Sequence, residues 1–203
     1  SDATALLAWA QVTAGVRGIH GPMAAQLGEL PDDDVAWLFR MMEDTEPAGR
    51  LPTQLTGIGR WPDKPAAPVE GALAGGNLCL LSHLLSTPYC PNFAGRILML
   101  EEVGERPYRL DRYLTHLGLA GVLDAVAGVL LGDLEGCGET VHADHPEPLA
   151  VVDERLRRYR VPGLSGLHFG HGQRNLALPL SARCRLDLAA GTLSLLEPAV
   201  AAH

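Results

Sequence analysis

Four consecutive apolar residues, Ile97 to Leu100, are followed at once by Glu101 and Glu102. An uninterrupted apolar run of this length is typical of a strand that is buried on both faces, as in parallel sheets. The segment VAGVLLGD at 126–133 has the same character. In open α/β sheets, functional groups lie at the carboxyl ends of the strands. The sequence therefore predicts an α/β fold with candidate functional groups at Glu101 and Glu102.

Four segments have the apolar spacing of amphipathic helices. They are 3–14, with Leu6, Leu7, Ala10 and Ala14 on one face; 32–44, with Val35, Leu38, Phe39 and Met42 inward; 107–124, with Leu110, Leu114, Leu117 and Leu119 recurring along it; and 148–160. Ser1 and Asp2 precede the first helix, and both are residue types that cap helices with their side chains. GALAGGN at 71–77 predicts a glycine turn before a short helix that presents Leu78, Leu81 and Leu85 on one side.

The remaining segments predict loops and short strands. VRGIHGP at 16–22 favours a strand that ends at His20, and residues 164–198 favour a glycine-rich loop followed by two or three strands with a hairpin turn at Ala190 and Gly191. Five prolines and no sustained periodicity mark residues 47–70. We therefore expect a linker at 59–70 between two domains.

Charge and composition exclude several classes of partner. The 203 residues carry a formal net charge of −8, which argues against nucleic acid, because binding to phosphates requires a basic surface. There is no run of eighteen apolar residues and no charged leader, so we expect neither a membrane span nor a membrane partner.

The cysteines and histidines give little sign of a metal site. Cys79, Cys90, Cys137 and Cys184 lie far apart without a CxxC pair, so we expect free thiols and a reducing, cytoplasmic location. Cys137, His142 and His145 have imaginable ligand spacing, but they lie in a loop without a second cluster to close a tetrahedral site. We therefore expect neither a metal nor another cofactor.

Three residues could form a nucleophilic triad in the chain order serine, acid, histidine. Ser1 lies at a helix start, Glu101 at a strand end and His171 between two glycines. A serine hydroxyl needs an imidazole to take its proton, and the imidazole needs a carboxylate to fix its tautomer. The alternatives at this point are Ser1 as a helix cap, Glu101 as a structural acid, and His168 with His171 as metal ligands.

Several short motifs together resemble the LD-carboxypeptidase family of serine peptidases, which includes muramoyltetrapeptide carboxypeptidases and microcin C immunity carboxypeptidases. The matching pieces are SDATALL (1–7), HGPM (20–23), GGNL (75–78), TPY (87–89), LEEVGE (100–105), PYRLDRYL (107–114), GVLLGD (128–133), FGHG (169–172) and the closing LPL and LD. The resemblance covers nearly all of the chain. Two positions depart from the family's pattern, with His168 in place of proline and Ser181 in place of glycine.

The resemblance implies a role for each matched residue. Ser1 would be the nucleophile, His171 the general base and acid, and Glu101 the acid that orients His171, with Glu102 as its rival. The backbone N–H of Asp2 would supply half of the oxyanion hole. The candidate substrate-binding residues are Gly76, Asn77, Glu102 and His168.

The resemblance also implies an architecture and an activity. Residues 1–58 would be the C-terminal part of a Rossmann-like nucleophile domain whose upstream strands are missing, 59–70 the linker, and 71–203 a C-terminal swivelling β/β/α-type domain. The activity would be release of the terminal D-Ala from murein tetrapeptides by a cytoplasmic homodimer. The alternatives are a carboxypeptidase acting on peptidyl-nucleotide antibiotics, an N-terminal nucleophile hydrolase, and a muropeptide-binding module without turnover.

Overall fold

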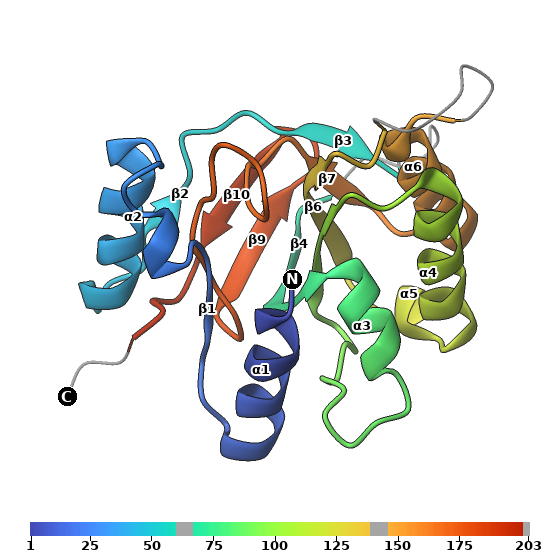
Figure 1. Cartoon of the computed structure of the whole chain (residues 1–203), viewed down its shortest axis with the longest axis horizontal. Helices are drawn as coiled ribbons and strands as arrows, with labels where there is room; N and C mark the ends of the chain where they lie inside the picture. The colour runs from blue at the N-terminus through green and yellow to red at the C-terminus, as the bar shows by residue number, and fades with distance from the viewer. Residues whose placement is uncertain (60–66, 139–145, 201–203) are drawn as a thin grey trace.

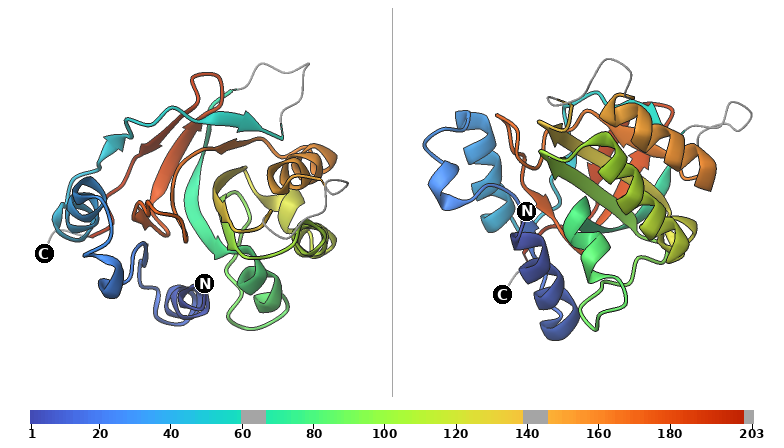
Figure 2. Two further views of the ribbon diagram at one scale, coloured as in Figure 1. Left: turned by 45° about the horizontal axis from the view of Figure 1, so that its top comes forward. Right: turned by 45° about the vertical axis from the view of Figure 1, so that its right-hand side comes forward.

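An eight-stranded mixed sheet runs through the molecule, with helices on both of its faces (Figures 1 and 2). The computed structural model describes residues 1–59, 67–138 and 146–200. The helices are α1 (Ala3–Trp9), the π-helix η1 (Ala10–Ala14), the 3-10 helix η2 (Ala24–Gln26), α2 (Asp32–Glu43), α3 (Leu78–Leu84), α4 (Pro107–Leu119), α5 (Val122–Ala125) and α6 (Pro148–Tyr159). The strands are β1 (Ile19–His20), β2 (Gly49–Arg50), β3 (Thr56–Ile58), β4 (Val69–Asn77), β5 (Ile97–Val103), β6 (Gly128–Glu135), β7 (Gly163–Ser165), β8 (Leu178–Pro179), β9 (Arg183–Asp187) and β10 (Thr192–Leu195).

The middle of the sheet is parallel and its flanks are antiparallel. The strand order is β2-β10-β9-β4-β5-β6-β7-β3, and β1 pairs with β8 in a separate two-stranded ribbon. Strands β4 to β7 run parallel, because a helical crossover separates each from the next. Their carboxyl ends therefore meet at one edge of the sheet. This arrangement confirms the predicted α/β class.

Strand β5 is buried on both faces, as its apolar run predicts. Leu98 and Leu100 belong to the core under α3 to α6, whereas Ile97 and Met99 belong to a second core on the opposite face. The alternation follows from the period of two in a strand. Helices α3 to α6 therefore cover one face of the sheet, and α2 packs on the opposite face (Figure 2).

Helix α2 is rotated relative to the prediction, so that the buried face includes the residues that directly precede Val35 and Met42. Asp34 and Met41 are buried, whereas Phe39 and Met42, which we expected to face inward, are 45% and 51% exposed. Residues 34 and 41 are seven positions apart, about two helical turns, so they lie on the same face of α2. Burial of the Asp34 carboxylate therefore sets the rotation of α2 about its own axis. Two leucines that we expected on apolar helix faces are also exposed to solvent, namely Leu6 in α1 and Leu119 at the end of α4.

The glycine-rich segment 71–77 is a strand, and the predicted glycine turn is wrong. It forms most of β4, which pairs with β9 on one side and β5 on the other. A side chain on Gly71 would lie 2.6 Å from the carbonyl oxygen of Gly95, and one on Gly75 would collide with the backbone of Met99. The glycines are thus required by close approach of neighbouring strands rather than by a turn.

The expected linker coincides in part with this strand. Residues 60–66 lie outside the described residues, and Val69 and Glu70 already begin β4. All four cysteines lie in the described part of the chain and are free thiols, as predicted. Among the described residues, no helix has the length and apolar character needed to cross a bilayer.

Candidate active site

His171 and Glu101 form a short hydrogen bond at the carboxyl edge of the parallel strands. His171 lies in the loop that follows β7, and its Nδ1 is 2.7 Å from Oε2 of Glu101 in β5. Glu101 is 1% exposed. Burial raises the pKa of this carboxyl group, and the neighbouring imidazole of His171 opposes the rise. The buried carboxylate of Glu101 therefore holds the imidazole of His171 in one orientation.

Ser1 completes this row of groups from the other side of the imidazole. Its main-chain nitrogen lies 2.9 Å from Nε2 of His171. Because a main-chain N–H group donates hydrogen bonds, Nε2 accepts and the ring proton belongs on Nδ1, where it is donated to Glu101. This is the tautomer that a general base requires. The Ser1 hydroxyl is three covalent bonds from that nitrogen, so rotation about Cα–Cβ sets its distance from Nε2.

Asp2 occupies the N-cap position of α1 without capping it through its side chain. The carbonyl groups of Ser1 and Asp2 accept hydrogen bonds from the backbone N–H groups of Thr4 and Ala5, at 2.9 and 3.1 Å. The predicted side-chain caps are therefore wrong, because the first turn is closed by the backbone. The N–H of Asp2 lies at the positive end of the helix dipole.

Glu102 faces away from His171 and is fully engaged. Its Oε1 accepts hydrogen bonds from Nδ2 of Asn77 at 2.7 Å and from the N–H of Val103 at 3.0 Å, and its Oε2 accepts from the N–H of Cys79 at 2.8 Å. Oδ1 of Asn77 in turn caps α3 by accepting from the N–H of Leu80 at 3.1 Å. Both side chains are buried. Glu101 and Glu102 thus lie on opposite faces of β5, and the imidazole contact belongs to Glu101.

Gly76 brings helix α1 against the edge of the sheet. Oγ1 of Thr4, a buried residue that the sequence did not single out, accepts a hydrogen bond from the N–H of Asn77 at 3.0 Å. A Cβ atom on Gly76 would lie 2.6 Å from that same oxygen, and the φ of Gly76 is +144°. Gly76 and Asn77 therefore hold the start of α1, and with it Ser1, beside the strand end.

His168 forms a second imidazole–carboxylate pair, three residues before His171. Its Nδ1 lies 2.9 Å from Oδ1 of Asp133 at the end of β6, and the imidazole is more than half exposed. The N–H of Asp133 donates to the carbonyl oxygen of Phe169 at 3.1 Å. Asp133 therefore holds the loop that carries His171 (residues 166–177, the His171 loop) against the sheet, and the imidazole of His168 remains exposed to solvent.

Asp34 fastens the other end of the His171 loop. Its carboxylate is fully buried and accepts hydrogen bonds from the guanidinium of Arg174 and, at 3.1 Å, from the N–H of Asn175. Oδ1 of Asn175 accepts from the N–H of Gly170 at 3.0 Å. A helix about 140 residues away in sequence therefore fixes the loop on both sides of His171.

We expect Asp34→Asn to lower the free energy of unfolding by about 1–3 kcal/mol, because it removes a charged acceptor from its hydrogen bonds with the Arg174 guanidinium and the Asn175 N–H. Urea unfolding at pH 7 measures this change. Asp33→Asn, a matched exposed carboxylate in the same helical turn, should change stability by less than about 0.5 kcal/mol. Equal effects of the two substitutions would show that the buried contacts of Asp34 are not what stabilises the loop.

His20 lies beside the site with an uncompensated buried nitrogen. Its ring packs edge-on against Phe169, with centroids 5.9 Å apart, and its Nδ1 has no hydrogen-bond partner among the described residues. Burial of the ring is the largest cause that lowers the pKa of His20 from 6.5 to about 4, and the nearby imidazole of His171 acts in the same direction. His20 is therefore neutral at pH 7.

This shift predicts a loss of stability in mild acid. Between pH 6.5 and 4 the unfolded chain binds a proton at His20 that the folded chain does not, so the free energy of unfolding falls as pH falls. The loss at pH 4 is about 3 kcal/mol. Urea unfolding at pH 7 and pH 4 should show this part of the acid sensitivity removed in His20→Gln and retained in the exposed control His83→Gln. An unchanged pH dependence in His20→Gln would contradict the assignment.

No cluster in the described ranges offers a metal ion three or more histidine, cysteine, aspartate or glutamate ligands. His168 and His171 pair with separate carboxylates rather than facing one shared position. Of the loop candidates, Cys137 is buried, whereas His142 and His145 lie outside the described residues.

Comparison with known proteins identifies the family of the chain. Residues 70–186 match the model of the LD-carboxypeptidase C-terminal domain. A carboxypeptidase-like protein of Synechocystis is 35% identical over 97% of the chain, and the murein tetrapeptide carboxypeptidase of Pseudomonas aeruginosa is 32% identical over 85%. The chain spans 62% and 57% of the lengths of these two relatives, so it corresponds to less than two thirds of either.

Solved structures give the same result. The muramoyltetrapeptide carboxypeptidase of Oxalobacter formigenes is 28% identical, with a TM-score of 0.73 over 96% of the chain and 65% of the neighbour. The microcin C7 self-immunity protein shares the fold, with a TM-score of 0.82 and 24% identity over 99% of the chain and 67% of the neighbour. On the family match and the Synechocystis relative together, the chain belongs to the LD-carboxypeptidase family of peptidases.

Proposed function

We propose that the protein is a serine carboxypeptidase that releases the terminal D-Ala of murein tetrapeptides by cutting the bond between an L-configured centre and D-Ala. The observation that carries the proposal is the row formed by Ser1, His171 and Glu101, whose contacts run through the two nitrogens of one imidazole. The names of the Pseudomonas and Oxalobacter relatives support the substrate.

The proposed chemistry assigns one task to each group. The Ser1 hydroxyl attacks the carbonyl carbon while Nε2 of His171 takes its proton, and the same proton then passes to the leaving amine of D-Ala. Water enters and hydrolyses the acyl-enzyme with His171 again as base. The Asp2 N–H, at the positive end of α1, stabilises the oxyanion. Glu101 holds the tautomer and stabilises the imidazolium. No step uses a metal or cofactor.

The sequence-based assignments of architecture remain part of this proposal. Residues 1–58 belong to a nucleophile domain, 59–70 to a linker and 71–203 to the C-terminal domain, and the complete protein works as a cytoplasmic homodimer. Gly76, Asn77 and Glu102 act by holding the start of α1 and β5, which their burial favours over direct contact with the peptide. His168, whose imidazole is exposed, is the member of that set that can contact substrate.

The test is release of free D-Ala from UDP-muramoyl tetrapeptide by the complete protein, detected by mass spectrometry. A peptide ending in L-Ala is the matched control and should not be cut. Release from the D-Ala peptide alone supports the proposal. Failure of a folded protein to release D-Ala, with turnover of a peptidyl-nucleotide instead, would replace it with the antibiotic-directed activity. Binding of muropeptide without any turnover would indicate a binding module.

N-terminal sequencing of the protein expressed from its complete gene addresses the remaining alternative. An N-terminal nucleophile hydrolase would use the free amine of Ser1 as base, which requires Ser1 to be the first residue of the mature chain. Active protein that retains residues before Ser1 would exclude that mechanism.

A further inference from the structure

The two glycines that flank His171 each lie against a carboxylate at the end of a central strand. A Cβ atom on Gly170 would lie 2.7 Å from Oε2 of Glu101, and one on Gly172 would lie 2.7 Å from Oδ2 of Asp133. Glu101 belongs to β5 and Asp133 to the neighbouring strand β6. Glu101 bonds the imidazole of His171, whereas Asp133 approaches the backbone directly after it.

Asp133 also contacts the beginning of the His171 loop. Its N–H donates to the carbonyl oxygen of Phe169 at 3.1 Å, and its Oδ1 lies 2.9 Å from Nδ1 of His168. The carbonyl oxygen of His168 in turn accepts from the N–H of Leu176 at 2.8 Å, which closes the loop on itself. Oδ2 of Asp133 is buried and accepts no hydrogen bond from the described residues. This oxygen therefore meets Gly172 through shape rather than through a hydrogen bond.

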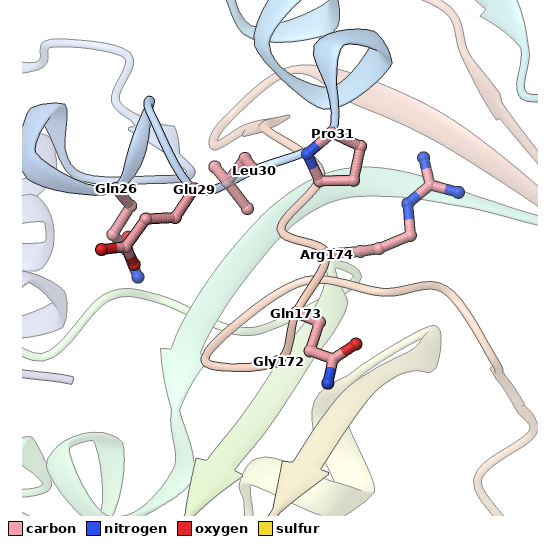
Figure 3. A pocket seen from close by; sticks show the side chains of 7 residues that line it. All are labelled: Gln26, Glu29, Leu30, Pro31, Gly172, Gln173 and Arg174. Atoms are coloured by element: carbon pink, nitrogen blue, oxygen red, sulfur yellow. The ribbon is translucent and has the colours of Figure 1, made fainter.

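The other side of the loop borders open space. Residues 172–174 line a pocket of about 560 Å³ (Figure 3). Its remaining lining residues are Gln26, Glu29, Leu30 and Pro31. Asp34 fixes the loop from Arg174 onwards, through its bonds to the Arg174 guanidinium and the Asn175 N–H. The backbone between His171 and Arg174 thus depends on its contact with Asp133.

This contact bears on the proposed proton transfer. The hydrogen bond to Glu101 fixes Nδ1 of the His171 ring but not the backbone from which the ring projects. If that backbone shifts, the ring pivots about Nδ1, and Nε2 moves relative to Ser1. A general base must lie within about 2.6–3.2 Å of the group whose proton it takes. A displacement of about 1 Å can cost on the order of 10²-fold in rate.

We infer that Asp133 is a positioning residue, which together with His168 sets the place of the His171 backbone and so the approach of Nε2 to Ser1. This inference rests on the proposed function for the reaction that the loop serves. Asp133 acts through the loop and not on the substrate. Its loss should therefore lower kcat and leave KM unchanged.

The first experiment measures kcat and KM for D-Ala release by the complete protein. Asp133→Ala should lower kcat about 30- to 100-fold, whereas Asp133→Asn, which keeps the size and the acceptor for His168, should retain at least about a third of it. Asp111→Ala is the control, because Asp111 pairs with Arg155 in the helix layer and should keep full activity. A rise in KM at constant kcat in Asp133→Ala would place the pair in the substrate-binding site and overturn the inference. Equal losses in Asp133→Ala and Asp133→Asn would assign the effect to charge and also overturn it.

Gly172→Ala tests the same contact by size. The new methyl group would meet Oδ2 of Asp133, and that carboxylate cannot swing aside without breaking its bond to His168. We expect a kcat loss of about tenfold, and no further loss when Gly172→Ala is added to Asp133→Ala, where the methyl group has room. Gly28→Ala, at an exposed glycine where no atom of the described residues lies within 4 Å of the added methyl group, is the control. Losses that multiply in the double variant would contradict the inference.

Hydrogen exchange separates this inference from the proposed reaction. In Asp133→Ala the N–H of Leu176 should exchange at least about tenfold faster, while the N–H of Leu51, which is bonded to Leu193 elsewhere in the sheet, should be unchanged. That result in a parent protein that releases no D-Ala would refute the reaction and still support the positioning contact. Unchanged exchange of Leu176, or faster exchange with an unchanged kcat in an active protein, overturns the inference.

Discussion

Ser1→Ala is expected to lower kcat for D-Ala release by about 10⁴- to 10⁶-fold, with KM nearly unchanged. The methyl group keeps the start of α1 and its backbone contacts but removes the only proposed nucleophile. Residual turnover would come from the oxyanion donor and from substrate positioning. The loss should therefore be confined to the chemical step.

Rates of D-Ala release by the parent and variant proteins, followed by mass spectrometry, measure this effect. Ser194→Ala is the matched control, because Ser194 lies in β10 on an outer part of the sheet and should retain full activity. Labelling by a serine-directed phosphonate should likewise be lost in Ser1→Ala and kept in Ser194→Ala. Retention of more than about a tenth of kcat in Ser1→Ala would rule out Ser1 as nucleophile.

Glu101→Gln is expected to lower kcat by about 10³- to 10⁴-fold while the protein stays folded. The amide nitrogen can donate to Nδ1 of His171, which would move the ring proton to Nε2 and leave no base facing Ser1. The cost thus comes from a wrong tautomer and from the lost charge beside the imidazolium. KM should change little, because Glu101 is buried behind His171.

Glu102→Gln is the matched control for this prediction, since it makes the same chemical change one residue later in β5. Glu102 accepts hydrogen bonds from Asn77, Cys79 and Val103, so its loss should lower stability. The folded fraction of Glu102→Gln should keep most of the kcat of the parent protein. Steady-state kinetics together with urea unfolding of both variants separates the two effects. A larger kcat loss in Glu102→Gln would assign the orienting role to Glu102 instead.

Local patterns predict the parallel centre of the fold and the place of Glu101 at the end of a central strand. The apolar run before Glu101 favours a strand buried on both faces, which places the polar residues after it at the edge of the sheet. The glycines around His171 mark a loop that can approach that edge. The site roles themselves rest on the family resemblance and stay predictions until the substitutions are made.

Contacts between distant segments could not be predicted in this way. Asp34 is the third of three adjacent aspartates, and only the rotation of α2 on the sheet decides which one is buried. Gly75 and Gly76 read locally as a turn, because the neighbours that exclude a side chain, Met99 and Thr4, are distant in sequence.

The two short strands from the early part of the chain have a consequence for biosynthesis. Strand β3 pairs with β7, with Ile58 opposite Gly163, and β2 pairs with β10, with Arg50 opposite Ser194. In both pairs the partner strand is synthesised much later than the first strand. At translation rates of about 5–20 residues per second, these partners emerge on the order of ten seconds apart. Such distant pairing also makes folding slow once the chain is complete. Nascent chains are therefore expected to present open sheet edges to chaperones until their last strands arrive.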